Sequence, residues 1–364
     1  MKARTGNARA APFSFKGRGA ADNPQNRFER QAREAFDDGW VLDGEDERGP
    51  RTEVTLTQAR SIISRNASPD IPFTQSINPY QGCEHGCVYC YARPSHAYLG
   101  LSPGLDFETK LFAKANAAQL LRAELSRPGY RCEPISLGAN TDPYQPIERK
   151  YKLTRAILEV LSECNHPLGI VTKSAMVERD LDLLAPMARM GLVHVFVSIG
   201  TSEHELMRRL EPRTAAPQRR LEVLRALSAA GIPCGVLVAP IIPFLNDRDM
   251  EAVLERSAAH GASMAGYQIL RLPYELKGLF KDWLERNYPL KAAHVMSQVR
   301  QMRGGRENDP RFGKRMSGEG IFAELQENRF RLACERSGLN LHGRNRLDTT
   351  RFRPPATKRQ LSLF

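Results

Sequence analysis

Three of the chain's seven cysteines lie close together, at Cys83, Cys87 and Cys90, with the spacing C-x3-C-x2-C. An odd total with three thiols on one short segment makes a poor disulfide framework and fits a set of metal ligands. Three thiolates can bind three irons of a 4Fe-4S cluster and leave the fourth iron open, whereas ferredoxin and zinc sites normally supply a fourth protein ligand. The spacing therefore predicts an iron-sulfur cluster with one open iron.

A zinc site completed by His85 or His96 is the alternative interpretation of the same cysteines. The sequence contains no second pair of zinc ligands, and the cysteines precede a long series of strands and helices. We therefore favour the cluster and keep a zinc-stabilised nucleic-acid-binding module as an alternative.

The elements that would position the cysteines begin near Gln75, where short apolar runs start to alternate with amphipathic segments. The runs predict strands over 74–78, 134–138, 168–172, 194–199, 233–239 and 267–272. The segments between them predict helices over 154–164, 177–190, 217–230 and 248–260. Near-continuous apolar strands separated by helices require parallel pairing with right-handed crossovers. The pattern predicts an α/β fold, a partial (β/α)6 TIM-like barrel with too few strands to close.

Two extensions flank this core. We expect residues 1–60 to form an N-terminal extension that is partly disordered, residues 61–290 to form the core domain, and residues 291–364 to form a basic C-terminal extension with one helix over 321–336. The last segment has 16 Lys and Arg against 7 Asp and Glu, and so carries most of the net charge of +12. Such a block favours phosphate-rich partners, which makes nucleic acid a candidate partner, although a solvated tail has the same composition.

The cysteine spacing, with the aromatic Tyr89 directly before Cys90, resembles the radical SAM superfamily, and the resemblance covers roughly residues 75–290. It implies a 4Fe-4S cluster whose open iron binds the amino and carboxylate groups of S-adenosylmethionine (SAM). It also implies an enzyme that cleaves SAM reductively to a 5'-deoxyadenosyl radical. The electron would come from a flavodoxin- or ferredoxin-type donor.

Reactive groups of parallel α/β barrels lie at the carboxyl ends of the strands, and the resemblance implies that SAM is bound there. The matching positions are Asn140, Thr141 and Asp142 for the amino group, Lys173 and Ser198 for the carboxylate and ribose, and Ile242 for the adenine. Each polar residue has a plainer alternative role, as a turn former, a loop cation or a hydroxyl in a loop.

Within the superfamily the chain resembles the spore-photoproduct-lyase-like, or DNA repair photolyase-like, branch. The lyase places a hydrogen-donating cysteine just before a Thr-Asp pair, where this chain has Ala139 and Asn140, which puts that repair reaction in doubt. The resemblance implies lyase- or oxidoreductase-type radical chemistry on an unassigned substrate. The basic block favours nucleic acid, and a protein, peptide or small molecule is the alternative.

The sequence has no apolar run of the roughly 20 residues that a bilayer span needs. Its first residues are charged and polar where a signal peptide would be apolar. We therefore expect a cytoplasmic protein with no membrane partner.

Overall fold

The main sheet of the computed structural model, which describes residues 15–29, 50–341 and 346–355, has seven strands in the order β10-β9-β8-β7-β6-β3-β2. The strands are β2 (Ile63–Arg65), β3 (Gln75–Ile77), β6 (Ile135–Leu137), β7 (Leu168–Thr172), β8 (Val193–Ser198), β9 (Cys234–Ile241) and β10 (Met264–Ile269). All neighbours from β3 to β10 pair in parallel, and β2 is antiparallel to β3. The six parallel strands confirm the predicted partial barrel.

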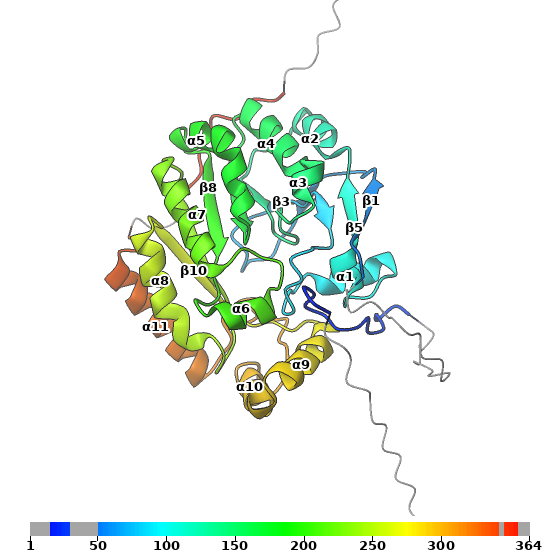
Figure 1. Cartoon of the computed structure of the whole chain (residues 1–364). Coiled ribbons are helices and arrows are strands. Elements are labelled where there is room, and N and C mark those ends of the chain that lie inside the picture. The colour runs from blue at the N-terminus through cyan, green and yellow to red at the C-terminus, as the bar shows by residue number, and fades with distance from the viewer. Residues whose placement is uncertain (1–14, 30–49, 342–345, 356–364) are drawn as a thin grey trace, which may run out of the picture.

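Helices cross over between consecutive parallel strands and cover the outside of the sheet (Figure 1). They are α2 (Ala117–Leu125), α3 (Glu148–Tyr151), α4 (Leu153–Glu163), η2 (Ala175–Asp180), α5 (Leu181–Arg189), α6 (His204–Leu210), α7 (Pro217–Ala229), η3 (Asp247–Asp249) and α8 (Met250–Ala259). One apolar core fills the space between the sheet and these helices, with fully buried side chains such as Ile170, Val195 and Leu224.

A second, smaller sheet with the order β1-β5-β4 lies beside the first. It consists of β1 (Glu53–Thr57), β4 (Tyr80–Gln81) and β5 (Lys110–Lys114), with η1 (Arg93–Leu99) and α1 (Asp106–Thr109) between β4 and β5. The sequence did not predict this sheet. Residues 53–57, which we assigned to the N-terminal extension, pair in parallel with β5. Of that extension, residues 1–14 and 30–49 lie outside the described part of the chain.

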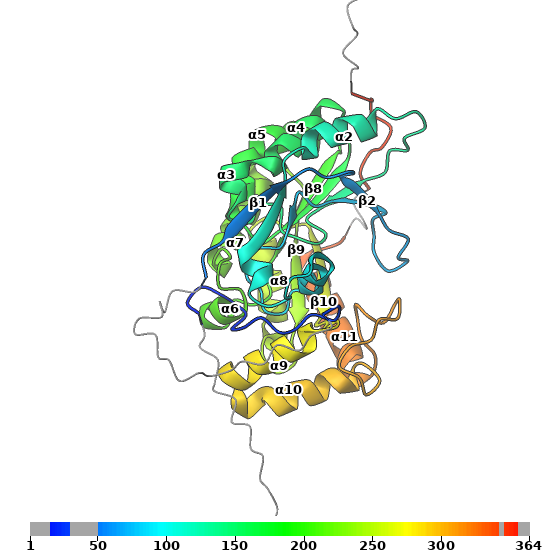
Figure 2. The same ribbon diagram turned by 90° about the vertical axis from the view of Figure 1, so that its right-hand side faces the viewer.

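The chain continues past the barrel in three helices, α9 (Leu276–Asn287), α10 (Pro289–Gln301) and α11 (Ile321–Ser337). The predicted helix over 321–336 is confirmed as α11, which packs against α8 and β10, whereas α9 and α10 were not predicted. Figure 2 shows α9 and α10 side by side at one end of the barrel. Residues 346–355 run back along the molecule, where Phe352 packs against Tyr130 and His166.

The predicted strands and helices match with small shifts. Strand β7 has the predicted bounds, while β10 begins and ends three residues earlier than 267–272. Ala265 and Gly266 hide its start, because small residues interrupt an apolar run. None of the helices in the described part of the chain has both the length and the apolar character that crossing a membrane requires.

Candidate metal and cosubstrate site

The three cysteines lie on one loop directly after β4, at the carboxyl end of the barrel strands. Backbone hydrogen bonds fix this loop to its surroundings: the N–H of Cys83 donates to the Phe107 carbonyl at 2.9 Å, and the N–H of Val88 donates to the Leu210 carbonyl at 3.0 Å. All three thiols are free, with Cys83 and Cys87 buried and Cys90 half-buried. The loop thus presents three thiols from a backbone held on both sides.

A buried ion pair between Arg93 and Glu108 lies against the cysteine loop, and neither side chain is exposed. The Arg93 guanidinium donates to the carbonyls of Cys87 at 2.8 Å and Gly86 at 3.0 Å, as well as to Gly104 at 2.9 Å. A guanidinium that donates to several carbonyls and a carboxylate has its charge and its donors satisfied at once. Arg93 therefore fixes the backbone between the first two cluster cysteines.

Residues 15–29, here called the N-terminal strap, lie across the cysteine loop. The Glu108 carboxylate accepts hydrogen bonds from the N–H groups of Gly19 at 3.0 Å and Ala20 at 2.9 Å. A Cβ at Gly19 would lie 1.8 Å from the Gly86 carbonyl oxygen, so only glycine permits this approach. Figure 1 shows the strap, in dark blue, running between α6 and α1 near α9. Glu108 thus joins the strap to the cysteine loop through Arg93.

Asp142, predicted as a SAM contact, accepts hydrogen bonds from the end of β7 and from its own loop. Its carboxylate accepts from the Lys173 N–H at 2.7 Å, the Thr172 hydroxyl at 2.8 Å and the Tyr144 N–H at 2.9 Å, and it lies 3.3 Å from Nδ1 of His85. Burial disfavours both charges, but their mutual attraction prevails: the pKa of Asp142 falls to about 2 and that of His85 rises to about 10. Asp142 therefore ties the ends of β6 and β7 to the cysteine loop.

Lys173, at the end of β7, is half-buried among groups of both charges. Burial opposes its charge, yet Cys87 and Glu211 hold the pKa of Lys173 above its usual range. Its ammonium lies 6.0 Å from the Tyr89 ring centroid. The Tyr89 hydroxyl donates to Glu211, and Arg220 forms a buried ion pair with the same carboxylate. A cation is therefore held beside the second cysteine at the mouth of the barrel.

The other predicted residues lie at neighbouring strand ends. The backbone N–H groups of Asn140 and Thr141 donate to Asn78 Oδ1 at 2.9 and 3.3 Å, and the Thr141 hydroxyl donates to the Tyr80 carbonyl at 2.9 Å. Ser198 is buried and its carbonyl accepts from Arg220 at 2.7 Å. Ile242 belongs to the apolar cluster that contains Cys87, Val88 and Tyr89. The fold thus brings every predicted position to one end of the barrel.

The donor set fits an iron-sulfur cluster better than a single metal ion. Within residues 15–29, 50–341 and 346–355, no three His, Cys, Asp or Glu side chains converge closely enough to hold one ion. A cluster has a different requirement, since each of its thiolates binds a different iron. Burial raises the pKa values of Cys87 and Cys90, and each thiol also feels the charge of Cys83. Three thiols presented on one loop beside a lysine suit a metal cluster, which stabilises the thiolate form.

Comparison with known proteins gives the class. A family model described as Radical SAM superfamily matches residues 77–256, which span the cysteine loop and most of the barrel. The chain belongs to this superfamily and is a radical SAM enzyme, a class that uses SAM. This membership favours the cluster over the zinc module. His96, one of the two proposed zinc ligands, instead bonds through Nε2 to the Lys110 carbonyl at 2.9 Å.

Sequence relatives come from distant organisms and carry names without an activity. Uncharacterized protein Rv2578c of Mycobacterium tuberculosis is 42% identical over 252 residues, which cover 69% of this chain and 72% of the relative. Uncharacterized protein MJ0683 of Methanocaldococcus jannaschii is 28% identical over 239 residues, or 66% of this chain and 85% of the relative. Similar sequences thus occur in both a bacterium and an archaeon.

Among solved structures, spore photoproduct lyase complexed with a dinucleoside spore photoproduct has a TM-score of 0.56 at 18% identity, covering 79% of this chain and 80% of the lyase. Another structure of a variant lyase has both SAM and the dinucleoside photoproduct bound. The match shows a shared fold, as the sequence resemblance implied.

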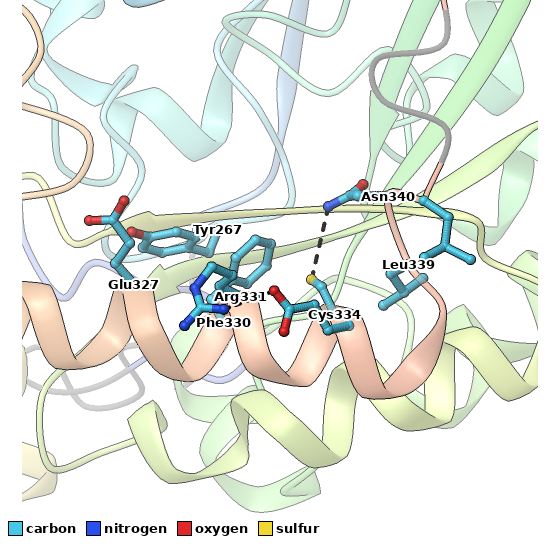
Figure 3. Close-up of a pocket in the computed structure, with 9 residues that line it drawn as sticks. Tyr267, Glu327, Phe330, Arg331, Cys334, Leu339 and Asn340 are labelled. Carbon is cyan, nitrogen blue, oxygen red and sulfur yellow. Dashed lines mark hydrogen bonds and ion pairs between the residues drawn. The ribbon is translucent and has the colours of Figure 1, made fainter.

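A separate pocket lies between α11 and the edge strand β10 (Figure 3). Tyr267, Phe330, Cys334 and Asn340 are among the residues that line it. The Asn340 amide bonds to both the N–H and the carbonyl of Ala265, at 2.9 and 3.1 Å, which closes part of the free edge of β10. No residue of the cysteine loop or of the strand ends described above lines this pocket, so we do not assign SAM to it.

Sequence reasoning missed the residues that support the site. Arg93, Glu108 and Asn78 hold the loop and the end of β6 but contribute no metal ligand. Arg93 gave a signal, because a lone arginine lies three residues after Cys90 in an otherwise uncharged stretch. Glu108 gave none, since a glutamate on a short helix is commonly exposed.

Proposed function

We propose that this enzyme binds a 4Fe-4S cluster through Cys83, Cys87 and Cys90 and cleaves SAM reductively. The observation that carries the proposal is the cysteine loop itself, three free thiols held at the carboxyl end of a six-stranded partial barrel. When bound, the cluster supplies the electron that breaks the SAM sulfonium bond and gives a 5'-deoxyadenosyl radical. The protein's own part is to hold SAM, orient it and exclude water.

We assign SAM contacts to residues at four strand ends. Lys173 would pair with the SAM carboxylate, since its half-buried ammonium stays charged at the end of β7 beside the cysteine loop. Ser198 would contact the carboxylate or ribose, and Ile242 would pack against the adenine. Of the residues after β6, Asn140 is the best candidate for the amino group, because the Thr141 hydroxyl and the Asp142 carboxylate already have protein partners.

The substrate that we propose is nucleic acid. The excess of Lys and Arg in residues 291–364 supports this, as does the shared fold with a lyase whose structures contain a dinucleoside photoproduct. A protein, peptide or small molecule is the alternative. We further propose a cytoplasmic enzyme reduced by a flavodoxin- or ferredoxin-type protein, because a reducing compartment preserves the free thiols.

Anaerobic reconstitution tests the proposal. The protein should bind about four irons and four sulfides and, with dithionite, convert SAM to 5'-deoxyadenosine and methionine. Lys173→Ala and Ser198→Ala should weaken SAM binding while iron content stays constant. Lys150→Ala, which removes an exposed lysine on α3, is the matched control. Stoichiometric zinc without iron, or intact SAM after reduction, would refute the proposed chemistry.

A further inference from the structure

Two arginines near the mouth of the barrel form no ion pair with any carboxylate of the described residues. Arg271 lies two residues after β10, and Arg303 lies two residues after α10. Arg303 is only 1% exposed, and Arg271 is half-buried. In each of them Nε is buried without a hydrogen-bond partner. Nearby Arg315, by contrast, forms two hydrogen bonds to Asp70, at 2.7 and 2.5 Å.

Arg303 is buried behind Arg271 and bonds to the backbone next to it. It donates to the Leu270 carbonyl at 2.8 Å and to the Lys314 carbonyl at 2.7 Å. These bonds join the segment after α10 to the end of β10, so Arg303 fixes the backbone next to Arg271. A carbonyl carries only a partial negative charge, and the Asp309 and Glu319 carboxylates act on Arg303 without forming an ion pair with it, so its charge is only partly compensated.

Arg271 lies beside the cysteine loop. Its guanidinium carbon lies 5.7 Å from the centroid of the Tyr91 ring, and Tyr91 directly follows Cys90. The Tyr91 hydroxyl donates to the Ala139 carbonyl, just past β6. The one hydrogen-bond partner of Arg271 among the described residues is the Met316 sulfur, at 3.6 Å, a weak acceptor. The fork of donors on Arg271 is therefore largely free at the mouth of the barrel.

Charge that lacks an ion-pair partner in this way marks an anion site. Burial lowers the pKa of Arg271, and the nearby charge of Arg315 lowers it further. Burial and Arg271 likewise lower the pKa of Arg303, to about 10, so it stays protonated at neutral pH. Two close guanidinium cations repel one another, and each loses hydration on burial. A bound oxyanion would reduce both costs. A guanidinium fork suits the paired oxygens of phosphate.

Exposed aromatic rings next to this site favour a nucleotide over a simple carboxylate. The Arg27 guanidinium lies 4.4 Å from the ring of Tyr274, 4.6 Å from Phe28 and 4.9 Å from Tyr98. These rings are 62%, 54% and 74% exposed, although Arg27 itself is fixed by Glu275. Ordered, exposed aromatic rings beside arginine are the surfaces on which unpaired bases stack. Tyr274 comes three residues after Arg271, so the two Cα atoms are at most about 11 Å apart.

We infer that Arg271, backed by Arg303, binds a backbone phosphate of a single-stranded nucleic acid whose neighbouring bases stack on Tyr274, Tyr98 and Phe28. The inference rests on the proposed function, because it names the substrate class of the same barrel mouth. It assigns two kinds of contact, a charged one at Arg271 and an uncharged one at the aromatic rings. The two kinds have different salt dependences.

The test measures binding of a short fluorescent single-stranded DNA to the anaerobically reconstituted full chain, with SAM at saturation. Arg271→Gln should weaken binding about tenfold and reduce the log-log salt slope by about 0.7, one phosphate contact. Arg271→Lys should retain the slope at intermediate affinity. Tyr274→Asn, which suits the positive φ of 51° at this position, should weaken binding about tenfold without changing the slope.

The matched control is Arg122→Gln, which removes an exposed, ion-paired arginine on α2 and should change neither affinity nor slope. Equal binding by the Arg271→Gln and Arg122→Gln proteins would overturn the inference, and so would displacement of the DNA by an acidic peptide at lower concentration than by unlabelled DNA. Iron content and SAM cleavage of the wild-type protein without DNA are measured in parallel. Failure there refutes the proposed function, whereas failure of the slope test alone refutes only the phosphate site.

Discussion

The cysteine loop and the region beyond the end of β10, which contains Arg271 and Arg303, both bury charged side chains, but they do so in opposite ways. Around the loop each buried charge has an opposite partner: Arg93 has Glu108, Arg220 has Glu211, and His85 has Asp142. Beyond the end of β10, Arg271 and Arg303 form no ion pair with a carboxylate of the described residues. Paired charges hold a backbone in one geometry, which a cluster loop needs. Unpaired charges cost stability and are ready for a ligand.

The largest expected effect concerns the cysteine loop. Replacing Cys83, Cys87 or Cys90 with Ala should abolish stable iron binding, because each removes one of the three thiolates. Cys164→Ala, at a buried thiol outside the loop, should leave iron content unchanged. Iron and sulfide analysis after anaerobic reconstitution decides it, and retention of a full cluster in any loop variant would contradict the assigned ligand set.

Breaking a paired charge should be costly. Glu108→Gln leaves Arg93 buried without its counter-charge and weakens the acceptor of the Gly19 and Ala20 N–H groups. We expect a loss of about 3–5 kcal/mol in the free energy of unfolding, measured with urea on the reduced, iron-free protein. Glu163→Gln, at an exposed ion pair with Arg122, should cost below about 1 kcal/mol. Similar small losses in both would show that the buried pair does not hold the loop.

A third way to bury a titratable group is to keep it neutral, as at His166. Burial lowers the pKa of His166 from 6.5 to about 4, and its Nε2 lies 2.7 Å from the Tyr130 hydroxyl. Because the folded-state pKa is the lower one, its contribution to stability is complete above pH 6.5 and declines as the pH falls toward 4. Lowering the pH from about 7 to 5 should remove about 2 kcal/mol through this group.

Urea unfolding of wild-type and His166→Gln proteins at both pH values isolates this contribution. The variant should lose less stability between pH 7 and 5 than the wild type by about the same 2 kcal/mol. An equal loss in both proteins would mean that other groups produce the acid sensitivity.

The smallest expected effect has the opposite sign. Arg271→Met removes an unpaired charge and breaks only the contacts with Met316 and the Tyr91 ring, so it should stabilise the ligand-free protein by roughly 1 kcal/mol. Arg155→Met, which breaks ion pairs to Asp180 and Asp182, should destabilise it. Thermal unfolding compares the two. Destabilisation by both would show that Arg271 serves the fold rather than a ligand.

The barrel was predictable because its signal is local. Strand β7 is a short apolar run and α7 begins at Pro217, a residue favoured in the first turn of a helix, so each segment could be recognised alone. The second sheet was not recognised because β1 and β4 are short and partly polar, and gain their partners only through β5. Helix α9 has an amphipathic pattern in its sequence, with apolar residues at Leu276, Leu279, Phe280 and Trp283. We did not assign a helix there because we expected the core domain to end near residue 290.

The candidate site divides in the same way. The three cysteines and the residues after the strands follow from spacing and strand order, which place them at one end of any parallel barrel. Arg93 and Glu108, which support the cysteine loop, and the N-terminal strap, which lies across it, depend on contacts between distant segments. No local pattern could reveal that Gly19 is a glycine because the Gly86 carbonyl lies against it.

The strap also has a consequence for the timing of synthesis on the ribosome. Gly19 is made early, but its acceptor Glu108 is 89 residues further along the chain. At about 5–20 residues per second, roughly 5–20 s pass between the two. Cys83, Cys87 and Cys90 are all translated within that interval, before Glu108, the residue to which the strap bonds. The strap can therefore close over the loop only after all three cysteines have been made.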